Sequence, residues 1–254
     1  MSLPQTPSFR LDGRRALVTG ASSGIGQGAA VALAAAGAHV VCAARGMDRL
    51  SASVSEMQAE GFSAEAMHLD VGDLDAINSK LTEQAPFNIV VNAAGLARHT
   101  AALDTMPEDY DAVMDVNLRG AYFLSTEIAR AQIGAGIRGS IIHISSQMAH
   151  VGGIDRAVYA ASKHALEGMV KSMAIEWGPK GIRINSICPT FVRTPLTEPT
   201  FADPDRVAWI EQKIKLGRVG TVEDIMGAVV YLASDASALV TGSSILVDGG
   251  WTAG

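Results

Sequence analysis

The chain has 254 residues, of which 48% are hydrophobic and 5% aromatic, and its formal net charge is −6. The acidic balance and the lack of a basic tract argue against nucleic acid as the main partner. Its length allows one sizeable hydrophobic core, so we expect a single domain over residues 1–254.

Strand-like and helix-like segments alternate along the chain. In chain order, β-branched runs predict strands at 15–19, 39–43, 64–69, 88–91, 140–145, 183–187 and 244–247. Ala-rich amphipathic stretches predict helices at 24–36, 48–60, 74–84, 107–133, 158–177 and 222–233. This alternation predicts an α/β fold with a parallel sheet of about seven strands and helices on both faces. The proline-containing stretch at about 190–216 is predicted to be an insert that serves function or moves.

The cysteine, histidine and apolar content of the chain indicates its cellular compartment. Cys42 and Cys188 are too few for a disulfide scaffold and lack metal-ligand spacing. The six histidines show no closely spaced pair, so no metal site is expected. No apolar run is long enough to span a membrane, and the N-terminus lacks a signal-peptide pattern. We therefore expect a cytoplasmic protein without a membrane partner.

A glycine-rich turn follows the first predicted strand, in the sequence Thr19-Gly-Ala-Ser-Ser-Gly-Ile-Gly26. Glycine permits a tight turn and lets backbone N–H groups approach a pyrophosphate, which the positive end of a helix also attracts. The spacing differs from the usual Gly-x-Gly-x-x-Gly fingerprint. An ordinary glycine-rich turn is the alternative, but the position at the first strand–helix junction favours dinucleotide binding.

The end of the second predicted strand reads Cys42-Ala-Ala-Arg45 and carries no carboxylate. NAD enzymes usually place an acidic residue there to bind the ribose hydroxyls. An arginine can instead form a bidentate pair with a 2′-phosphate. We therefore predict that NADP(H) is preferred, with NAD(H) possible and a solvated Arg45 as the alternative interpretation.

Tyr159 and Lys163 are four residues apart, and Ser146 precedes the tyrosine by thirteen residues. A phenol with its ordinary pKa of about 10 is a poor acid near neutral pH. A lysine one helical turn away favours the ionised phenol and brings its proton exchange closer to pH 7. Alone, this spacing is more typical of a surface pair, so the other motifs have to support it.

Taken together, the motifs resemble those of the short-chain dehydrogenase/reductase family, from about Phe9 to Gly254. The matching segments are Thr19-Gly-x-x-x-Gly-x-Gly26, Leu69-Asp70-Val71, Asn92-Ala-Ala-Gly95, Asp-Val-Asn117-Leu, Ser145-Ser146, Tyr159-x-x-x-Lys163 and Val247-Asp-Gly-Gly250. The resemblance implies a Rossmann-type doubly wound sheet and a homotetramer. It also implies an NAD(P)-dependent oxidoreductase that acts on a small carbonyl compound or secondary alcohol.

The resemblance implies four catalytic residues. Tyr159 would be the general acid/base, and Ser146 would hydrogen-bond the substrate oxygen. Lys163 would lower the tyrosine pKa and bind the nicotinamide ribose, while Asn117 would hold a water behind Lys163.

Cofactor contacts are expected for a wider set. The set is Gly20, Ser22, Ser23, Gly24, Ile25, Gly26, Arg45, Asp70, Val71, Asn92, Ala93, Gly95, Tyr159, Lys163, Pro189, Val192 and Thr194. By resemblance, Asp70 would face the adenine and Thr194 the nicotinamide carboxamide. Two positions depart from the family pattern: Ala93 replaces a frequent asparagine, and Thr190 replaces the glycine that usually follows Pro189. The second change predicts a different backbone conformation beside the nicotinamide.

The substrate is less well defined by the sequence. Gln147 and His150 lie between Ser146 and Tyr159 and favour a sugar-like or polyol substrate, and Trp209 is expected to contribute to a lid. A 3-oxoacyl thioester reductase is one alternative, for which the basic residues of the insert are ambiguous support. A non-catalytic dinucleotide-binding sensor is another, which retention of all four catalytic residues disfavours.

Overall fold

The computed structural model of the chain describes residues 3–254, and its strands form one parallel sheet in the order β3-β2-β1-β4-β5-β6-β7. The strands are β1 (Arg15–Thr19), β2 (His39–Ala44), β3 (Ala64–His68), β4 (Ile89–Asn92), β5 (Ser140–Ile144), β6 (Arg183–Pro189) and β7 (Ser244–Val247). The predicted α/β fold with a seven-stranded parallel sheet is confirmed.

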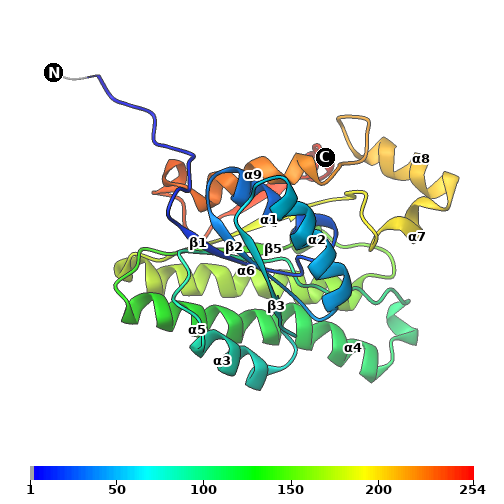
Figure 1. Ribbon diagram of the computed structural model, residues 1–254. Helices are drawn as coiled ribbons and strands as arrows, with labels where there is room; N and C mark the ends of the chain where they lie inside the picture. The colour runs from blue at the N-terminus through cyan, green and yellow to red at the C-terminus, as the bar shows by residue number, and fades with distance from the viewer. Residues whose placement is uncertain (1–2) are drawn as a thin grey trace.

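Helices cover both faces of the sheet (Figure 1). One face carries α1 (Gly24–Ala35), α2 (Met47–Ala59) and α9 (Glu223–Ala233). The other carries α3 (Leu74–Thr82), α4 (Pro107–Met114), α5 (Ala121–Gly134) and α6 (Ala157–Trp177). Among the described residues, no helix has the length and apolar character needed to cross a bilayer.

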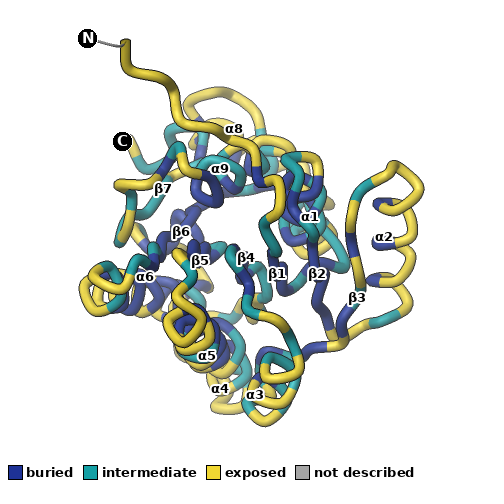
Figure 2. The backbone as a smooth tube through the Cα atoms, turned by 60° about the vertical axis from the view of Figure 1, so that its left-hand side comes forward, coloured by how far each residue is buried: buried dark blue, intermediate teal, exposed yellow. Residues whose placement is uncertain are grey.

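The two faces bury separate apolar clusters. Leu33, Leu50 and Val229 belong to the cluster under α1, α2 and α9, whereas Leu124 and Leu166 belong to the one under α5 and α6. The inner strands β1, β2, β4, β5 and β6 are buried almost throughout, as Figure 2 shows, whereas the edge strands β3 and β7 are partly exposed. This double burial explains the continuous apolar runs in the sequence, because a parallel sheet covered on both faces has no solvent-facing side.

The helix predicted at 107–133 is interrupted. Between α4 and α5 lies the π-helical segment η2 (Asp115–Gly120), which contains Asn117. A Cβ added to Gly120 would lie 2.1 Å from the carbonyl oxygen of Val71, so glycine is required for this close approach. A π turn inserts one residue into a continuous helix, which leaves the apolar pattern nearly unchanged and therefore escapes sequence inspection.

The predicted insert contains two helices that project from one end of the molecule (Figure 1), α7 (Glu198–Phe201) and α8 (Pro204–Lys213). Asp203 caps α8, because its side chain accepts hydrogen bonds from the backbone N–H groups of Asp205 at 3.0 Å and Arg206 at 3.3 Å. Ile210 is fully buried and fixes the helix to the body of the protein. The insert thus contains a capped helix that one buried side chain joins to the body of the protein.

Candidate active site

The loops that follow β1, β4, β5 and β6 meet at the carboxyl edge of the sheet. The strand order reverses between β1 and β4, and in open α/β sheets the ligand crevice forms at such a reversal. Most of the residues predicted to act in binding or catalysis follow these strands.

The glycine-rich turn is held tightly against the loop after β4 and the insert. Gly20 has φ +69°, and a Cβ there would lie 2.8 Å from the backbone of Ala93. Gly24 has φ +57°, and its added Cβ would lie 3.3 Å from the side chain of Thr194. The structure therefore brings Gly20, Gly24, Ala93 and Thr194 together, as the sequence predicts for a cofactor crevice.

The N-terminus of α1 offers unused hydrogen-bond donors. Ser23 is the N-cap, yet its side chain makes no capping hydrogen bond. Within residues 3–254, the backbone N–H groups of Ser23, Gly24 and Ile25 have no acceptor. Free donors at the positive end of a helix suit a pyrophosphate, so these residues fit the phosphates of a dinucleotide.

Arg45 and Asp70 lie together where β2 and β3 end. Nη1 of Arg45 is 4.0 Å from Oδ2 of Asp70, and the arginine side chain is 70% exposed. Oδ1 of Asp70 accepts a hydrogen bond from the backbone N–H of Gly72 at 2.9 Å. An exposed ion pair at this separation is weak, so the guanidinium remains available to an anionic ligand.

The remaining predicted cofactor residues are spread around the crevice. The turn requires glycine at position 26, because a Cβ added there would lie 2.1 Å from the carbonyl oxygen of Gly20. Pro189 ends β6, and Val192 forms an isolated bridge with Gly220. Val71 is different, because its side chain is buried in the cluster under α5 and α6.

Asn92 joins the strands below the crevice. Its Oδ1 accepts a hydrogen bond from the hydroxyl of Thr19 at 2.6 Å, and its Nδ2 is 3.4 Å from Nδ1 of His143. Nε2 of His143 is 3.0 Å from the Ser125 hydroxyl. Burial lowers the pKa of His143 to about 4, so the ring is neutral at pH 7. Sequence reasoning missed His143 and Ser125, because a single histidine in a buried strand gives no signal.

Tyr159 and Lys163 stand one turn apart on α6, as predicted. Nζ of Lys163 donates a hydrogen bond to the carbonyl oxygen of Ile144 at 2.9 Å and lies 5.7 Å from the centre of the tyrosine ring. Burial lowers the pKa of Lys163 to about 8. The lysine ammonium thus faces the end of β5 beside the phenol.

The lowering of the Tyr159 pKa by Lys163 stays a prediction, because burial is the largest influence on that pKa in this structure and acts in the other direction. Burial raises the pKa of Tyr159, and what opposes the rise is the Ser146 hydroxyl and the positive charge of Arg156. Burial removes the water that would stabilise the charged phenolate, and this effect on the pKa is larger than those of Ser146 and Arg156. Arg156, three residues before the tyrosine, was not recognised in the sequence as part of the site.

Ser146 is positioned by the short helix η3 (Gln147–Ala149) that follows it. Its hydroxyl accepts a hydrogen bond from the backbone N–H of Met148 at 3.1 Å and donates one to Oε1 of Gln147 at 3.0 Å. The influence of Ser146 on the Tyr159 pKa supports the choice of Ser146 over Ser145.

Asn117 ties the loop after β4 to α6. Its Oδ1 accepts from the backbone N–H of Leu96 at 2.8 Å, and its Nδ2 donates to the Leu96 carbonyl at 2.9 Å and to the Ser162 hydroxyl at 3.1 Å. A Cβ on Gly95 would lie 3.5 Å from Oδ1 of Asn117 and 4.0 Å from Nζ of Lys163. Asn117, Gly95 and Lys163 are therefore neighbours, as the sequence predicts.

An aromatic cluster of Phe191, Trp209 and Trp251 stands above β6. The rings of Phe191 and Trp251 stack with centres 5.3 Å apart, and Trp209 meets Trp251 edge-on at 5.4 Å. Phe191 has φ +30°, an unusual conformation for an aromatic residue. The residue with positive φ is therefore Phe191. It directly follows Thr190, the position at which the sequence departs from the family pattern.

A pocket of about 350 Å³ lies between this cluster and the start of α6. Its lining includes the aromatic cluster with Met148, Arg156 and Arg206. Of the three predicted substrate residues, Trp209 lines the pocket, but Gln147 and His150 do not. Gln147 is buried behind Ser146.

His150 instead approaches Glu167 and Cys188, and ligand atoms of the three residues lie within 4.8 Å of one another. The Glu167 carboxylate already accepts hydrogen bonds from the hydroxyl of Ser186 at 2.7 Å and the thiol of Cys188 at 3.5 Å. Burial raises the pKa of that thiol to about 12, which disfavours the thiolate that a metal requires. Glu167 and Cys188 thus belong to a buried hydrogen-bond network with Ser186, whereas His150 is exposed at its edge. The absence of a metal site stays a prediction.

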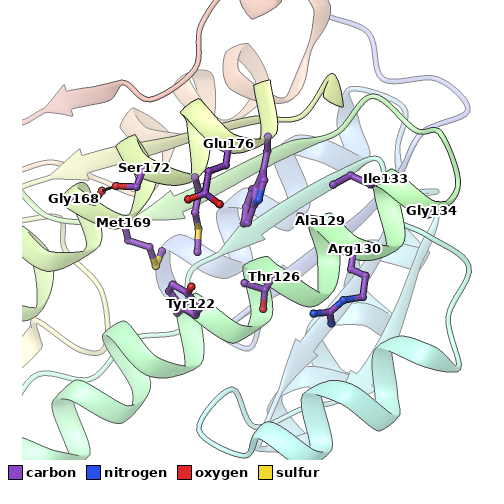
Figure 3. Close-up of a pocket in the computed structure, with 12 residues that line it drawn as sticks. Tyr122, Thr126, Ala129, Arg130, Ile133, Gly134, Gly168, Met169, Ser172 and Glu176 are labelled. Carbon is purple, nitrogen blue, oxygen red and sulfur yellow. Dashed lines mark hydrogen bonds between the residues drawn. The ribbon is translucent and has the colours of Figure 1, made fainter. Parts of the chain in front are cut away.

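A second hollow, of about 730 Å³, runs between α5 and α6. Figure 3 shows Tyr122, Thr126 and Arg130 of α5 facing Met169 and Ser172 of α6 across it. None of the predicted catalytic residues lines this hollow. The hollow shares no lining residue with the pocket at the aromatic cluster, so the two are separate.

Comparison with known proteins adds to this geometry. Residues 20–252 match the family model described as enoyl-(acyl carrier protein) reductase. The chain is 38% identical to D-erythrulose reductase of Gallus gallus over 245 residues, covering 96% of this chain and 98% of that protein. It is 37% identical to gluconate 5-dehydrogenase of Gluconobacter oxydans over 248 residues, covering 96% of each.

The fold of the chain also matches that of a solved structure. Gluconate 5-dehydrogenase from Burkholderia cenocepacia, in complex with NADP and tartrate, superposes with a TM-score of 0.93 at 35% identity. The match covers 97% of this chain and 98% of that one. The likeness thus extends over the glycine-rich turn, the Tyr159 region and the insert.

Proposed function

The chain belongs to the short-chain dehydrogenase/reductase family, and we propose that it transfers a hydride reversibly between NADP(H) and a sugar-like ketone or secondary alcohol. The observation that carries the proposal is the convergence of Ser146 and Lys163 on Tyr159, three residues after Arg156, which lines the pocket of about 350 Å³. Catalysis of this kind needs a proton donor next to a site that holds the cofactor.

Tyr159 is the general acid/base in this proposal. When bound in the crevice, the nicotinamide group supplies or accepts the hydride. The Tyr159 hydroxyl gives its proton to the substrate oxygen in reduction, and in oxidation the ionised Tyr159 phenolate takes the proton from the substrate hydroxyl. The Ser146 hydroxyl, which donates to Gln147 in this structure, donates to the substrate oxygen instead. A positioned acid–base group contributes roughly 10²- to 10⁴-fold to the rate.

Lys163 and Asn117 act behind the tyrosine. The Lys163 ammonium binds the ribose of the cofactor, and its hydrogen bond to Ile144 holds it at the end of β5. Asn117 fixes the backbone of Leu96 and thereby the loop that borders the cofactor. Asn117 would also hold a water behind Lys163, through which protons pass toward solvent. Asn117 and Lys163 lie on either side of Gly95.

Arg45 supports NADP(H) as the preferred cofactor. Its exposed guanidinium lies at the end of β2, and Asp70 is 4.0 Å away. A 2′-phosphate forms stronger, charge-assisted hydrogen bonds with arginine than a ribose hydroxyl does. The related Burkholderia enzyme was solved with NADP, which agrees with this choice.

We place the whole chain in a single domain, which assembles as a homotetramer in the cytoplasm. The single sheet supports one domain. The hollow between α5 and α6 is bordered by the exposed side chains of Tyr122 and Ile133, and a second subunit would cover them. Both cysteines are free, as is usual in a reducing compartment.

The decisive experiment is a spectrophotometric screen at 340 nm of ketoses, keto acids and polyols with NADPH or NADH and their oxidised forms. We expect turnover on at least one polyhydroxylated substrate, with higher kcat/KM for the phosphorylated cofactor. Tight NADPH binding without turnover across the panel would favour a dinucleotide sensor instead. Turnover restricted to 3-oxoacyl thioesters would favour the thioester reductase.

A further inference from the structure

Arg156 is a nearly buried arginine without a partner. It precedes α6 and only 8% of it is exposed. Within residues 3–254, its guanidinium forms no ion pair and no hydrogen bond, although it lines the pocket beside Tyr159. Desolvation of a guanidinium is costly unless an anion or hydrogen-bond acceptor compensates for it. Burial accordingly lowers the pKa of Arg156.

A second arginine faces the same pocket from the insert. Arg206 lies in the first turn of α8, three residues before Trp209, so both side chains project from one face of the helix. In the part of the chain that the structure describes, its side chain has no ion-pair or hydrogen-bond partner either. The positive charge of Arg206 further lowers the pKa of Arg156.

The two arginines repel each other and disfavour the charged form of a neighbouring histidine. Partial burial, followed by the charges of Arg156 and Arg206, lowers the pKa of His99 to about 4. The His99 ring stands edge-on to Tyr159, with centres 6.2 Å apart. Two positively charged side chains thus lie near the phenol, and their mutual repulsion is a cost that a bound anion would reduce.

We propose that the pocket binds a substrate with a carboxylate group, which Arg156 and Arg206 hold while a hydroxyl or keto carbon of the same molecule faces Tyr159. This inference rests on the proposed function and narrows its substrate class from sugars and polyols to sugar acids and related hydroxy acids. The aromatic cluster forms the apolar wall against which the carbon chain lies.

The pocket also contains two acidic residues, which limit the charge of the ligand. Asp155 and Asp203 line it, so the four charged side chains sum to zero. Asp203 is engaged as the cap of α8 and accepts two backbone N–H bonds. Two arginines opposed by two aspartates suit a singly charged carboxylate better than a doubly charged phosphate ester. The volume of about 350 Å³ is in the range that accommodates a small metabolite.

Paired ligands test the proposal in the full-length protein. D-gluconate, D-xylonate and tartrate are titrated calorimetrically into protein saturated with NADPH, each beside its neutral counterpart, sorbitol, xylitol or threitol. NADPH prevents oxidation, so binding is measured without turnover. We expect at least one acid to bind roughly 10- to 100-fold more tightly than its polyol. Equal or weaker binding of all three acids overturns the proposal, whether or not the protein is active in the substrate screen.

Variants assign the effect to the arginines. Arg206→Gln, at an exposed position, should weaken binding of that acid by roughly 10-fold or more and leave polyol binding unchanged. Arg156→Gln should do the same, with circular dichroism as the check that it folds. Lys213→Gln removes a positive charge from the same helix outside the pocket and should have no such effect. An equal loss in Lys213→Gln and Arg206→Gln, or tighter binding of sorbitol 6-phosphate than of every acid, would contradict the assignment.

Discussion

Nδ2 of Asn92 donates a hydrogen bond to Nδ1 of His143 across the adjacent strands β4 and β5, with the two nitrogens 3.4 Å apart. The bond fixes the tautomer, because Nδ1 must accept, and Nε2–H then donates to the hydroxyl of Ser125. Ser125 in turn donates to the carbonyl oxygen of Ala121 at 2.7 Å. A neutral His143 is therefore built into the floor of the cofactor crevice.

This arrangement predicts a loss of stability in mild acid. The folded protein holds the pKa of His143 at about 4, whereas the unfolded chain has the ordinary value of 6.5. Above pH 6.5 the ring is neutral in both states; below it, the unfolded chain binds a proton that the folded protein does not. Between pH 6.5 and 4, we expect His143 to remove about 3 kcal/mol from the free energy of unfolding.

Urea unfolding at a series of pH values measures this effect. His143→Gln should be less stable than the wild type at pH 7 but lose less of its stability between pH 7 and pH 4. His68→Gln removes an exposed histidine from β3 and serves as the control. If His143→Gln and His68→Gln showed the same pH dependence as the wild type, a buried neutral His143 could not explain the acid sensitivity.

Tyr159→Phe should separate catalysis from cofactor binding. The substitution keeps the ring and its packing but removes the hydroxyl that exchanges the proton. We expect kcat to fall by roughly 10²- to 10⁴-fold, while the Kd for NADPH, measured by fluorescence titration, changes little. Near-normal turnover in this variant would refute the assignment of Tyr159 as the general acid/base.

The strands and most of the helices could be predicted because their signals are local, whereas α7 and α8 of the insert were not predicted. The β-branched run of β1 and the glycine-rich turn after it form a continuous stretch that specifies strand, turn and helix. Tyr159 and Lys163 were likewise recognisable, because one helical turn separates them in the sequence.

The parts that escaped prediction depend on contacts between distant segments. Arg156 could be recognised as a candidate binding residue only in the structure, because α8 brings Arg206 to the same pocket. The two arginines are some fifty residues apart in the sequence. Trp251, near the C-terminus, meets Phe191 and Trp209 for the same reason. The raised pKa of Tyr159 also follows from burial, which spacing alone does not reveal.

Gly28→Ala should disturb the packing of α1 on α9. A Cβ at this position would lie 2.1 Å from Cγ1 of Val222, so one of the two helices would have to move. We expect a loss of about 1–3 kcal/mol in the free energy of unfolding, measured by urea titration. In a Val222→Ala background the same change should cost less, because the clashing methyl is absent.

Gly227→Ala is the matched control for that cycle. Gly227 is an exposed glycine inside α9, and an added Cβ would meet no atom within 4 Å. Alanine should stabilise the helix there by up to about 1 kcal/mol. Equal effects of Gly28→Ala in both backgrounds would show that contact with Val222 does not limit the residue at position 28.

Arg45→Asp should reverse the cofactor preference. The arginine side chain is 70% exposed, so the substitution is compatible with folding. It replaces a donor for the 2′-phosphate by a carboxylate that repels the phosphate and can accept hydrogen bonds from ribose hydroxyls. We expect the ratio of kcat/KM for NADP(H) to that for NAD(H) to fall by roughly 10- to 100-fold or more. Arg138→Asp makes the same charge change just before β5, at the amino edge of the sheet, and should leave the ratio unaltered. An unchanged ratio in Arg45→Asp would remove the basis for preferring NADP(H), whereas a fall of the same size in Arg138→Asp would trace it to overall charge.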